Sequence, residues 1–225
     1  MTTIVTVPDC TGVDTSGKLS PAMARALAGS SWQGAPIRFV FRYVPLPGNA
    51  GHGDIDPGEL EAIIDAGLML GLVQHCRLPG WAASGMQGTL DGQAASYAAK
   101  LAGYQLGAHL AFDLEGCRDV GAPVAAHVNA WAAEVAAAGY EPLLYVGYAA
   151  GLGPAELYDL PLVRAYWSDY GPRSVATRGF CLKQHAQTAI AGVGVDPDVA
   201  TADALGGRLL LMGREPAPTD PAPAA

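Results

Sequence analysis

The feature that most constrains this chain is the alternation, along nearly its whole length, of short apolar runs with Ala-rich stretches of helical spacing. Such alternation is typical of a parallel sheet whose strands are joined by crossover helices. Eight runs have the length of a strand. They cover residues 11–15 (or the run 4–7 before it), 37–44, 69–74, 108–115, 142–148, 163–167, 180–184 and 190–196.

Helices are expected in the first five connections between these runs. Ser20-Pro21 and Asp56-Pro57 each place a capping side chain before a proline, which is a favoured helix start. The later connections carry Gly, Pro and polar residues and lack the length for full helices. The expected helices are residues 20–28, 60–66, 93–106, 124–138 and 154–160, with a last one at 198–205 and a short strand or extended segment at 206–212.

This order of elements predicts an α/β fold, namely a (β/α) TIM-type barrel with helices mainly after the first five strands and helix-poor last three connections. A doubly wound open sheet is the alternative, because periodicity alone does not show that a sheet closes. Residues 1–212 are expected to form this single domain. The Pro- and Ala-rich residues 213–225 are expected to be a flexible tail.

Composition excludes several functions. The 225 residues carry 13 Lys plus Arg against 21 Asp plus Glu, a formal net charge of -8, which is the wrong sign for binding nucleic acid. No stretch has the length and apolar character of a membrane span. The N-terminus lacks the basic and apolar regions of a signal peptide, so we expect synthesis in the cytoplasm. The four scattered cysteines form no C-x-x-C pair, which argues against a zinc ribbon.

The most informative run is residues 108–115, which ends in His-Leu-Ala-Phe-Asp-Leu-Glu. Alternation puts its Leu and Phe side chains on one face and Asp113 and Glu115 on the other. Since the apolar face suits a cover of helices, the two carboxylates are expected to point into the mouth of the barrel. Neighbouring carboxylates with separated pKa values are what glycoside hydrolysis needs. A solvated strand end or a metal-binding pair is the alternative.

Two more acids are expected at the same mouth. Asp14 ends the first strand and Asp196 ends the eighth, and these two strands are neighbours in a closed barrel. Asp14 could instead form an Asx turn or a helix cap. Asp198 is expected to cap the helix that follows. A closed barrel therefore predicts that Asp14, Asp113, Glu115 and Asp196 converge.

These motifs resemble a known family. Gly-Val-Asp14-Thr-Ser, the Asp-x-Glu of the fourth strand, Trp167-Ser-Asp-Tyr and Gln184-His followed by Gly-Val-Gly-Val-Asp196 look like the family 25 glycoside hydrolases. Those are lysozymes that cleave between N-acetylmuramic acid and N-acetylglucosamine on a barrel with five helices and three helix-poor strands. The earlier part of the chain, with Phe-Arg-Tyr43, more closely resembles the related glycoside-hydrolase-like barrels of unknown function from actinobacteria and phages. The likeness covers about residues 11–200.

The resemblance implies a role for each acid. Glu115 would be the general acid, and Asp113 would orient or stabilise the acetamido group or the oxocarbenium ion of the substrate. Asp14 and Asp196 would complete the acidic floor. Side chains at or just beyond predicted strand ends, which could bind a sugar ring or be ordinary core, are Tyr43, Gln74, Tyr145, Trp167, Asp169 and Gln184.

The leading hypothesis is a muramidase- or endolysin-like glycoside hydrolase of phage or prophage origin that acts on peptidoglycan after release or export. A catalytically silent barrel that binds glycan, or serves in a phage or secretion assembly, is the alternative, and an enzyme on another glycan is a third. We expect a monomer with no cofactor and no metal. His75, Cys76, His109 and Cys117 lie near the predicted mouth, so a metal site or a Cys76–Cys117 disulfide there stays open.

Overall fold

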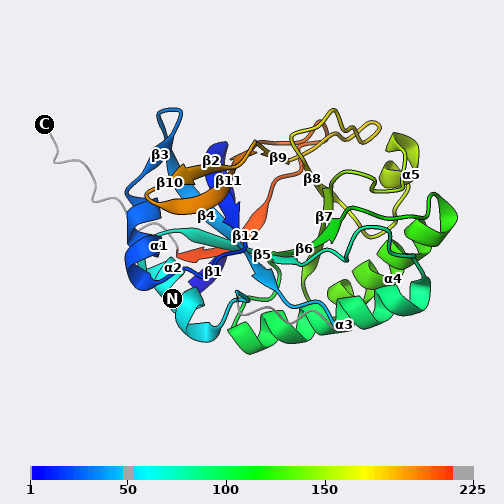
Figure 1. Ribbon diagram of the computed structural model, residues 1–225, viewed down its shortest axis with the longest axis horizontal. Coiled ribbons are helices and arrows are strands. Elements are labelled where there is room, and N and C mark those ends of the chain that lie inside the picture. Colours follow the sequence, from blue (N-terminus) through cyan, green and yellow to red (C-terminus); the bar gives the residue numbers. More distant parts are fainter. Residues whose placement is uncertain (1, 48–52, 215–225) are drawn as a thin grey trace, which may run out of the picture.

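The computed structural model describes residues 2–47 and 53–214. Within these residues the chain forms five α-helices around a closed eight-stranded barrel (Figure 1). The elements in chain order are β1 (Thr2–Thr6), β2 (Cys10–Thr15), α1 (Pro21–Ala28), β3 (Ser31–Trp32), β4 (Ala35–Val44), α2 (Pro57–Asp65), β5 (Met69–Gln74), α3 (Gly85–Ala102), β6 (His109–Leu114), α4 (Ala122–Ala137), β7 (Glu141–Val146), α5 (Pro154–Tyr158), β8 (Ala165–Ser168), β9 (Leu182–Gln184), β10 (Thr188–Ile190), β11 (Val193–Ala200) and β12 (Leu210–Arg214).

The barrel closes through the pairing of β4 with β5. Its strand order is β2, β4, β5, β6, β7, β8, β9, β11 and back to β2. Neighbours from β2 round to β9 are parallel, whereas β11 is antiparallel to both β9 and β2. The prediction of a closed barrel is thus confirmed and the open sheet is excluded. The all-parallel strand pattern of a TIM barrel is not present.

The direction of β11 follows from a tight turn before it. Ala191 and Gly192 have φ values of 53° and 79°, the left-handed conformation that a two-residue hairpin turn requires. The turn pairs β10 with β11 and sends the chain back down the barrel. The strand predicted at 190–196 is therefore divided, and the helix predicted at 198–205 is wrong, because β11 continues to Ala200.

Two apolar clusters stabilise the barrel, one on each face of the sheet. The outer cluster fills the space between the strands and the helices that cover them (Figure 1). The inner cluster fills the barrel with large rings, among them Phe39, Phe41 and Trp167. A Cβ atom at Gly12 would lie 2.2 Å from the ring of Phe39, so this strand needs a glycine where the ring approaches.

The end of the barrel opposite the mouth is covered by the antiparallel pair β1 and β12. β12 also pairs with the start of β5, at Met212 and Leu70. β12 includes Gly213 and Arg214, which were predicted to begin the flexible tail. The remainder of that predicted tail lies outside the described residues.

The helix predicted at 93–106 begins eight residues earlier, at Gly85, after a cap in which the Ser84 side chain accepts from the Gln87 amide. Its early turns contain glycines because α3 lies directly against α4. A Cβ atom at Gly88 would lie 2.1 Å from the carbonyl oxygen of His127. No helix in the described residues has the length and apolar character needed to span a membrane.

Gly88→Ala is expected to reduce the free energy of unfolding by about 1–3 kcal/mol, because the new methyl group forces α3 and α4 apart. Gly85→Ala is the matched control, since its Cβ would lie 3.7 Å from the nearest backbone oxygen. Urea denaturation of both variants measures the difference. Equal stability of the two would show that the helix contact is not tight.

Candidate active site

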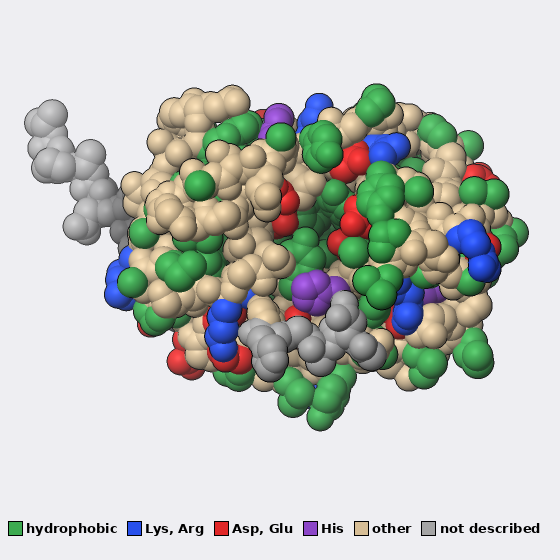
Figure 2. Space-filling view, viewed as in Figure 1, with side chains coloured by type: hydrophobic (Ala, Val, Ile, Leu, Met, Phe, Trp, Pro, Cys, Tyr) green, Lys and Arg blue, Asp and Glu red, His purple; other side chains and the backbone are tan. Residues whose placement is uncertain are grey.

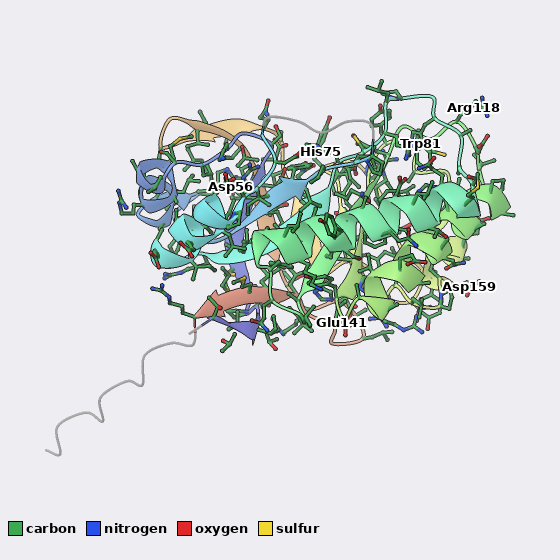
Figure 3. The ribbon with its side chains drawn as sticks, turned by 90° about the horizontal axis from the view of Figure 1, so that it is seen from below. Asp56, His75, Trp81, Arg118, Glu141 and Asp159 are labelled. Atoms are coloured by element: carbon green, nitrogen blue, oxygen red, sulfur yellow. The ribbon has the colours of Figure 1, made fainter. Side chains whose placement is uncertain are left out.

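The mouth of the barrel lies at the carboxyl ends of its parallel strands. Figure 2 shows this face hollowed at its centre, with Asp and Glu side chains on opposite walls of the hollow. Figure 3 shows His75 and Trp81, which follow β5, at one edge of the molecule and Glu141, which begins β7, at the opposite edge. The acids therefore gather at the end of the barrel where loops leave the strands.

Asp14, on β2, is the centre of a hydrogen-bond network. Its Oδ2 accepts from Nε2 of Gln184 at 2.8 Å, and its Oδ1 accepts from the hydroxyl of Tyr43 at 3.4 Å. The hydroxyl of Tyr145 donates in turn to Oε1 of Gln184 at 2.8 Å. Tyr43, Tyr145 and Gln184, predicted as sugar contacts, thus converge on Asp14 and fix its orientation.

Two acids of β11 lie beside Asp14. Asp196 is directly opposite Asp14 in the ladder, and it lies at the mouth because the antiparallel strand starts there. Asp198 lies two residues further down on the same face and is fully buried. Its Oδ1 accepts from Nε1 of Trp167 at 2.9 Å, whereas its buried Oδ2 has no hydrogen-bond partner among the described residues.

Sequence reasoning missed Asp198 by assigning it to a helix cap. The signal was the Asp-x-Asp spacing, which in a strand puts Asp196 and Asp198 on one face. That signal required knowing that β11 continues past Asp196.

Asp113 and Glu115 extend into the mouth from β6, as predicted, and the Cys76 thiol lies with them. One ligand atom from each of the three lies within 4.8 Å of the other two. Asp113 is 7% exposed, and its Oδ1 has no hydrogen-bond partner among the described residues. Glu115 is half-buried and packs over Gly147, where a Cβ atom would lie 2.6 Å from Glu115 Oε2.

Burial raises the pKa of each of these five acids, because it penalises the charged form. The pKa of Asp14 is raised to about 7, although the hydrogen bond from Gln184 acts the other way. Burial, reinforced by the charge of Glu115, holds the pKa of Asp113 well above its ordinary value. Burial and the charge of Asp14 do the same for Asp198.

The two outermost acids are affected in the same direction. Burial raises the pKa of Glu115 and of Asp196 above their ordinary values. The mouth therefore keeps protonated carboxyl groups at a pH where exposed ones are ionised, which is the condition for a carboxylic acid to donate a proton.

The structure corrects the placement of Gln74. Its side chain is on the outer face of β5, under α3 and α4, and is fully buried. Its Oε1 accepts from Nε1 of Trp131 at 2.8 Å, and its Nε2 donates to the carbonyl oxygen of Asp91 at 2.9 Å. Both ends of the amide are bonded within the protein, so Gln74 is not at the mouth.

Two other predicted sugar contacts have partners of their own. Trp167 is 1% exposed and packs against Phe41 and Tyr145 below the mouth, where it anchors Asp198. Asp169 forms an ion pair with Arg173 at 3.0 Å. Its charge still contributes to raising the pKa of Glu115, so Asp169 borders the site and acts on it electrostatically.

The sequence left open a metal site or a disulfide among two cysteines and two histidines, and these four residues do not form one cluster. Cys76 and Cys117 are both free thiols. His109 lies at the start of β6, where its Nδ1 accepts from the Leu210 amide at 2.8 Å. Nε2 of His75 lies 2.8 Å from Oδ1 of Asp54. Of the four, Cys76 alone is within reach of Asp113 and Glu115.

Fold and site together define a glycoside-hydrolase-like barrel whose mouth is lined by acids. The family described as "Rv2525c-like, glycoside hydrolase-like domain" matches residues 30–198, and the chain belongs to this family. The expected likeness to such barrels is confirmed at this level. Membership of family 25 itself stays a prediction.

Solved structures share the fold. The Tat-secreted protein Rv2525c of Mycobacterium tuberculosis, in complex with L-tartrate, has a TM-score of 0.64 and 16% identity, covering 88% of this chain and 98% of that one. An uncharacterized protein from B. stearothermophilus has a TM-score of 0.62 and 17% identity, covering 85% and 95%.

A third structure is more distant. The modular autolysin LytC of Streptococcus pneumoniae, in complex with a synthetic peptidoglycan ligand, has a TM-score of 0.53 and 11% identity, covering 85% of this chain and 46% of that one. None of the curated proteins matches this chain.

The raised pKa of Asp14 predicts that stability falls as the pH rises. The folded protein keeps a proton on Asp14 up to about pH 7, whereas the unfolded chain loses it near pH 4. The folded state binds more protons in this window, so the free energy of unfolding decreases from pH 4 to pH 7, by about 1.4 kcal/mol per unit of pKa difference.

Asp14→Asn, which is neutral throughout, should reduce this loss. Denaturant unfolding at pH 5 and pH 8 measures it. Asp159→Asn, at the exposed end of α5, is the control and should keep the wild-type dependence. An unchanged dependence in Asp14→Asn would show that Asp14 is ionised in the folded protein.

Proposed function

We propose that this protein is a glycoside hydrolase that cleaves bacterial cell-wall glycan by carboxylic acid catalysis. The observation that carries the proposal is the convergence of Asp113 and Glu115 at an open barrel mouth, one deeply buried and the other half-buried. Two carboxyl groups in unequal environments are the requirement for general acid catalysis at a glycosidic bond.

In this proposal the two groups have different tasks. Glu115 is the more accessible, and its raised pKa keeps the proton that it gives to the leaving glycosidic oxygen. Asp113 lies deeper and faces the sugar ring, where its carboxylate stabilises positive charge as the oxocarbenium ion develops. The Asp14 network forms the floor on which the ring rests.

The site acids are available for this chemistry. Arg42, the buried arginine of β4, binds Glu59 at 2.7 Å and not the acids of the mouth. Arg164 donates to the carbonyl oxygens of Leu160 and Val163. In the described residues, no ion pair joins Asp113 or Glu115 to a basic side chain.

A groove that neither Asp113 nor Glu115 lines, but that includes Gly147 beneath the Glu115 side chain, offers room for part of a polysaccharide. It has a volume of about 570 Å³, and its lining includes Gly147, Glu156 and Arg173. Glycines form much of its wall between β7 and α5, so a sugar could approach the backbone closely. The peptidoglycan ligand bound to LytC supports the cell wall as the source of substrate, and action there after release or export is part of the proposal.

One observation favours a second function, a silent barrel that binds glycan. Burial makes the charged form of Asp113 costly, and a protonated Asp113 would bind a sugar hydroxyl without stabilising an oxocarbenium ion. Turnover separates the two functions, because both predict binding and only the first predicts cleavage.

Glu115→Gln is expected to lower the release of reducing ends from purified peptidoglycan by at least about 100-fold, the lower range for loss of a general acid. Circular dichroism should show an unchanged fold. Glu141→Gln, at the far end of the barrel (Figure 3), is the matched control and should keep full activity.

The two possible failures have different meanings. Unchanged release in Glu115→Gln would remove Glu115 from the mechanism. If the wild-type protein co-sediments with peptidoglycan but releases no reducing ends from several purified peptidoglycans, the glycan-binding function replaces the enzymatic one.

A further inference from the structure

We propose that Cys76, Asp113 and Glu115 form a binding site for a divalent transition metal ion of the Zn²⁺ type. Cys76 follows β5, and Asp113 and Glu115 belong to the neighbouring strand β6 and the residue just beyond it. Their ligand atoms, one from each residue, lie within 4.8 Å of one another. Modest side-chain rotation therefore brings all three onto one ion.

The donor set selects the class of metal. A thiolate with two carboxylates suits Zn²⁺ and related borderline ions, whereas Mg²⁺ and Ca²⁺ prefer oxygen ligands alone. Three protein ligands leave a fourth tetrahedral position open to water or to a ligand. The site would thus be of the open kind.

An independent observation points to a missing partner at this place. Asp113 is more than nine-tenths buried, and its Oδ1 has no hydrogen-bond partner among the described residues. A buried, unpaired carboxylate oxygen is costly. A metal ion beside the Cys76 thiol would satisfy it, and no described Lys or Arg side chain is paired with any of the three residues.

The backbone around the ligands is held in place. Nε1 of Trp81 donates to the carbonyl oxygen of Glu115 at 2.8 Å, and the Gly116 amide donates to the carbonyl oxygen of Tyr148 at 2.8 Å. The glycine at 147 leaves space for the Glu115 side chain. Ligands on fixed backbone lose little freedom when the ion binds.

Binding is an exchange of protons for metal. The Cys76 thiol releases its proton to solvent as the sulfur–metal bond forms, and each protonated carboxyl group does the same. Because a metal-bound Glu115 has no proton to donate, and this consequence rests on the proposed function, Zn²⁺ should inhibit glycan hydrolysis.

The direct test uses Co²⁺ as a spectroscopic probe on the reduced, metal-free full chain. We expect a near-ultraviolet thiolate-to-cobalt absorption band that saturates at one equivalent and is displaced by Zn²⁺. The band should be lost in Cys76→Ser and kept in Cys10→Ser, a control cysteine at the start of β2. No band in the wild-type protein, or an equal band in Cys76→Ser, would overturn the proposal.

A second measurement needs no variant. Zn²⁺ should protect Cys76 from alkylation, as mapped by mass spectrometry, while the alkylation of Cys10 stays unchanged. Equal alkylation of Cys76 with and without Zn²⁺ would also overturn the site. If the protein shows the cobalt band but never cleaves glycan, the lack of cleavage refutes the proposed function, while the band supports the metal site. Glycan cleavage that Zn²⁺ does not affect, in a protein that shows no cobalt band, would refute the metal site and support the proposed function.

Discussion

The pairing of β11 with both β9 and β2 is the constraint on which the mouth depends. It joins β9 to β2, the two ends of the parallel run of strands, and because β11 runs antiparallel it starts at the mouth and descends into the interior. A parallel eighth strand would end at Asp196 and leave no second acid below it. The antiparallel one puts Asp196 at the rim and Asp198 in the interior, both against Asp14. The strand that completes the barrel therefore also brings its acids against Asp14.

The clustered acids have no basic partner in the described part of the chain, and hydrogen bonds from surrounding side chains reduce the free-energy cost of burying them together. An amide of Gln184 and a hydroxyl of Tyr43 donate to the carboxyl group of Asp14, and the indole N–H of Trp167 donates to that of Asp198. These donors come from strands far apart in the sequence, so the network forms only after closure. The remaining cost appears as raised pKa values, which link stability to pH and hold protons where general acid chemistry would use them.

The sequence predicts the parts of this arrangement that depend on period and order. Alternation in β6 correctly directs Asp113 and Glu115 inward, and the order of apolar runs correctly indicates closure. The sequence pattern could not predict the features that depend on contacts between elements. Gln74 ends a strand as expected, but its face is decided by the helices that cover it. The early turns of α3 resemble a loop in the sequence because they contain glycine. In the structure Gly88 is helical, and its lack of a side chain allows α3 to contact α4. The direction of β11 rests on two residues with positive φ.

Depth within the mouth separates the possible roles of its acids. Asp14 and Asp198 accept hydrogen bonds from Gln184, Tyr43 and Trp167, and in the proposed function they form the floor of the site. Within residues 2–47 and 53–214, Asp113 and Glu115 have no partner of opposite charge, and they differ in exposure. Because these two acids lack such partners, the mouth suits either of two ligands in our proposals. A glycan would take the proton from Glu115, whereas a metal ion would replace that proton and would also bind the Cys76 thiol sulfur. Because both occupants need the same carboxyl oxygens, they exclude one another, and the metal content of the surroundings would decide whether the barrel can act as an acid catalyst.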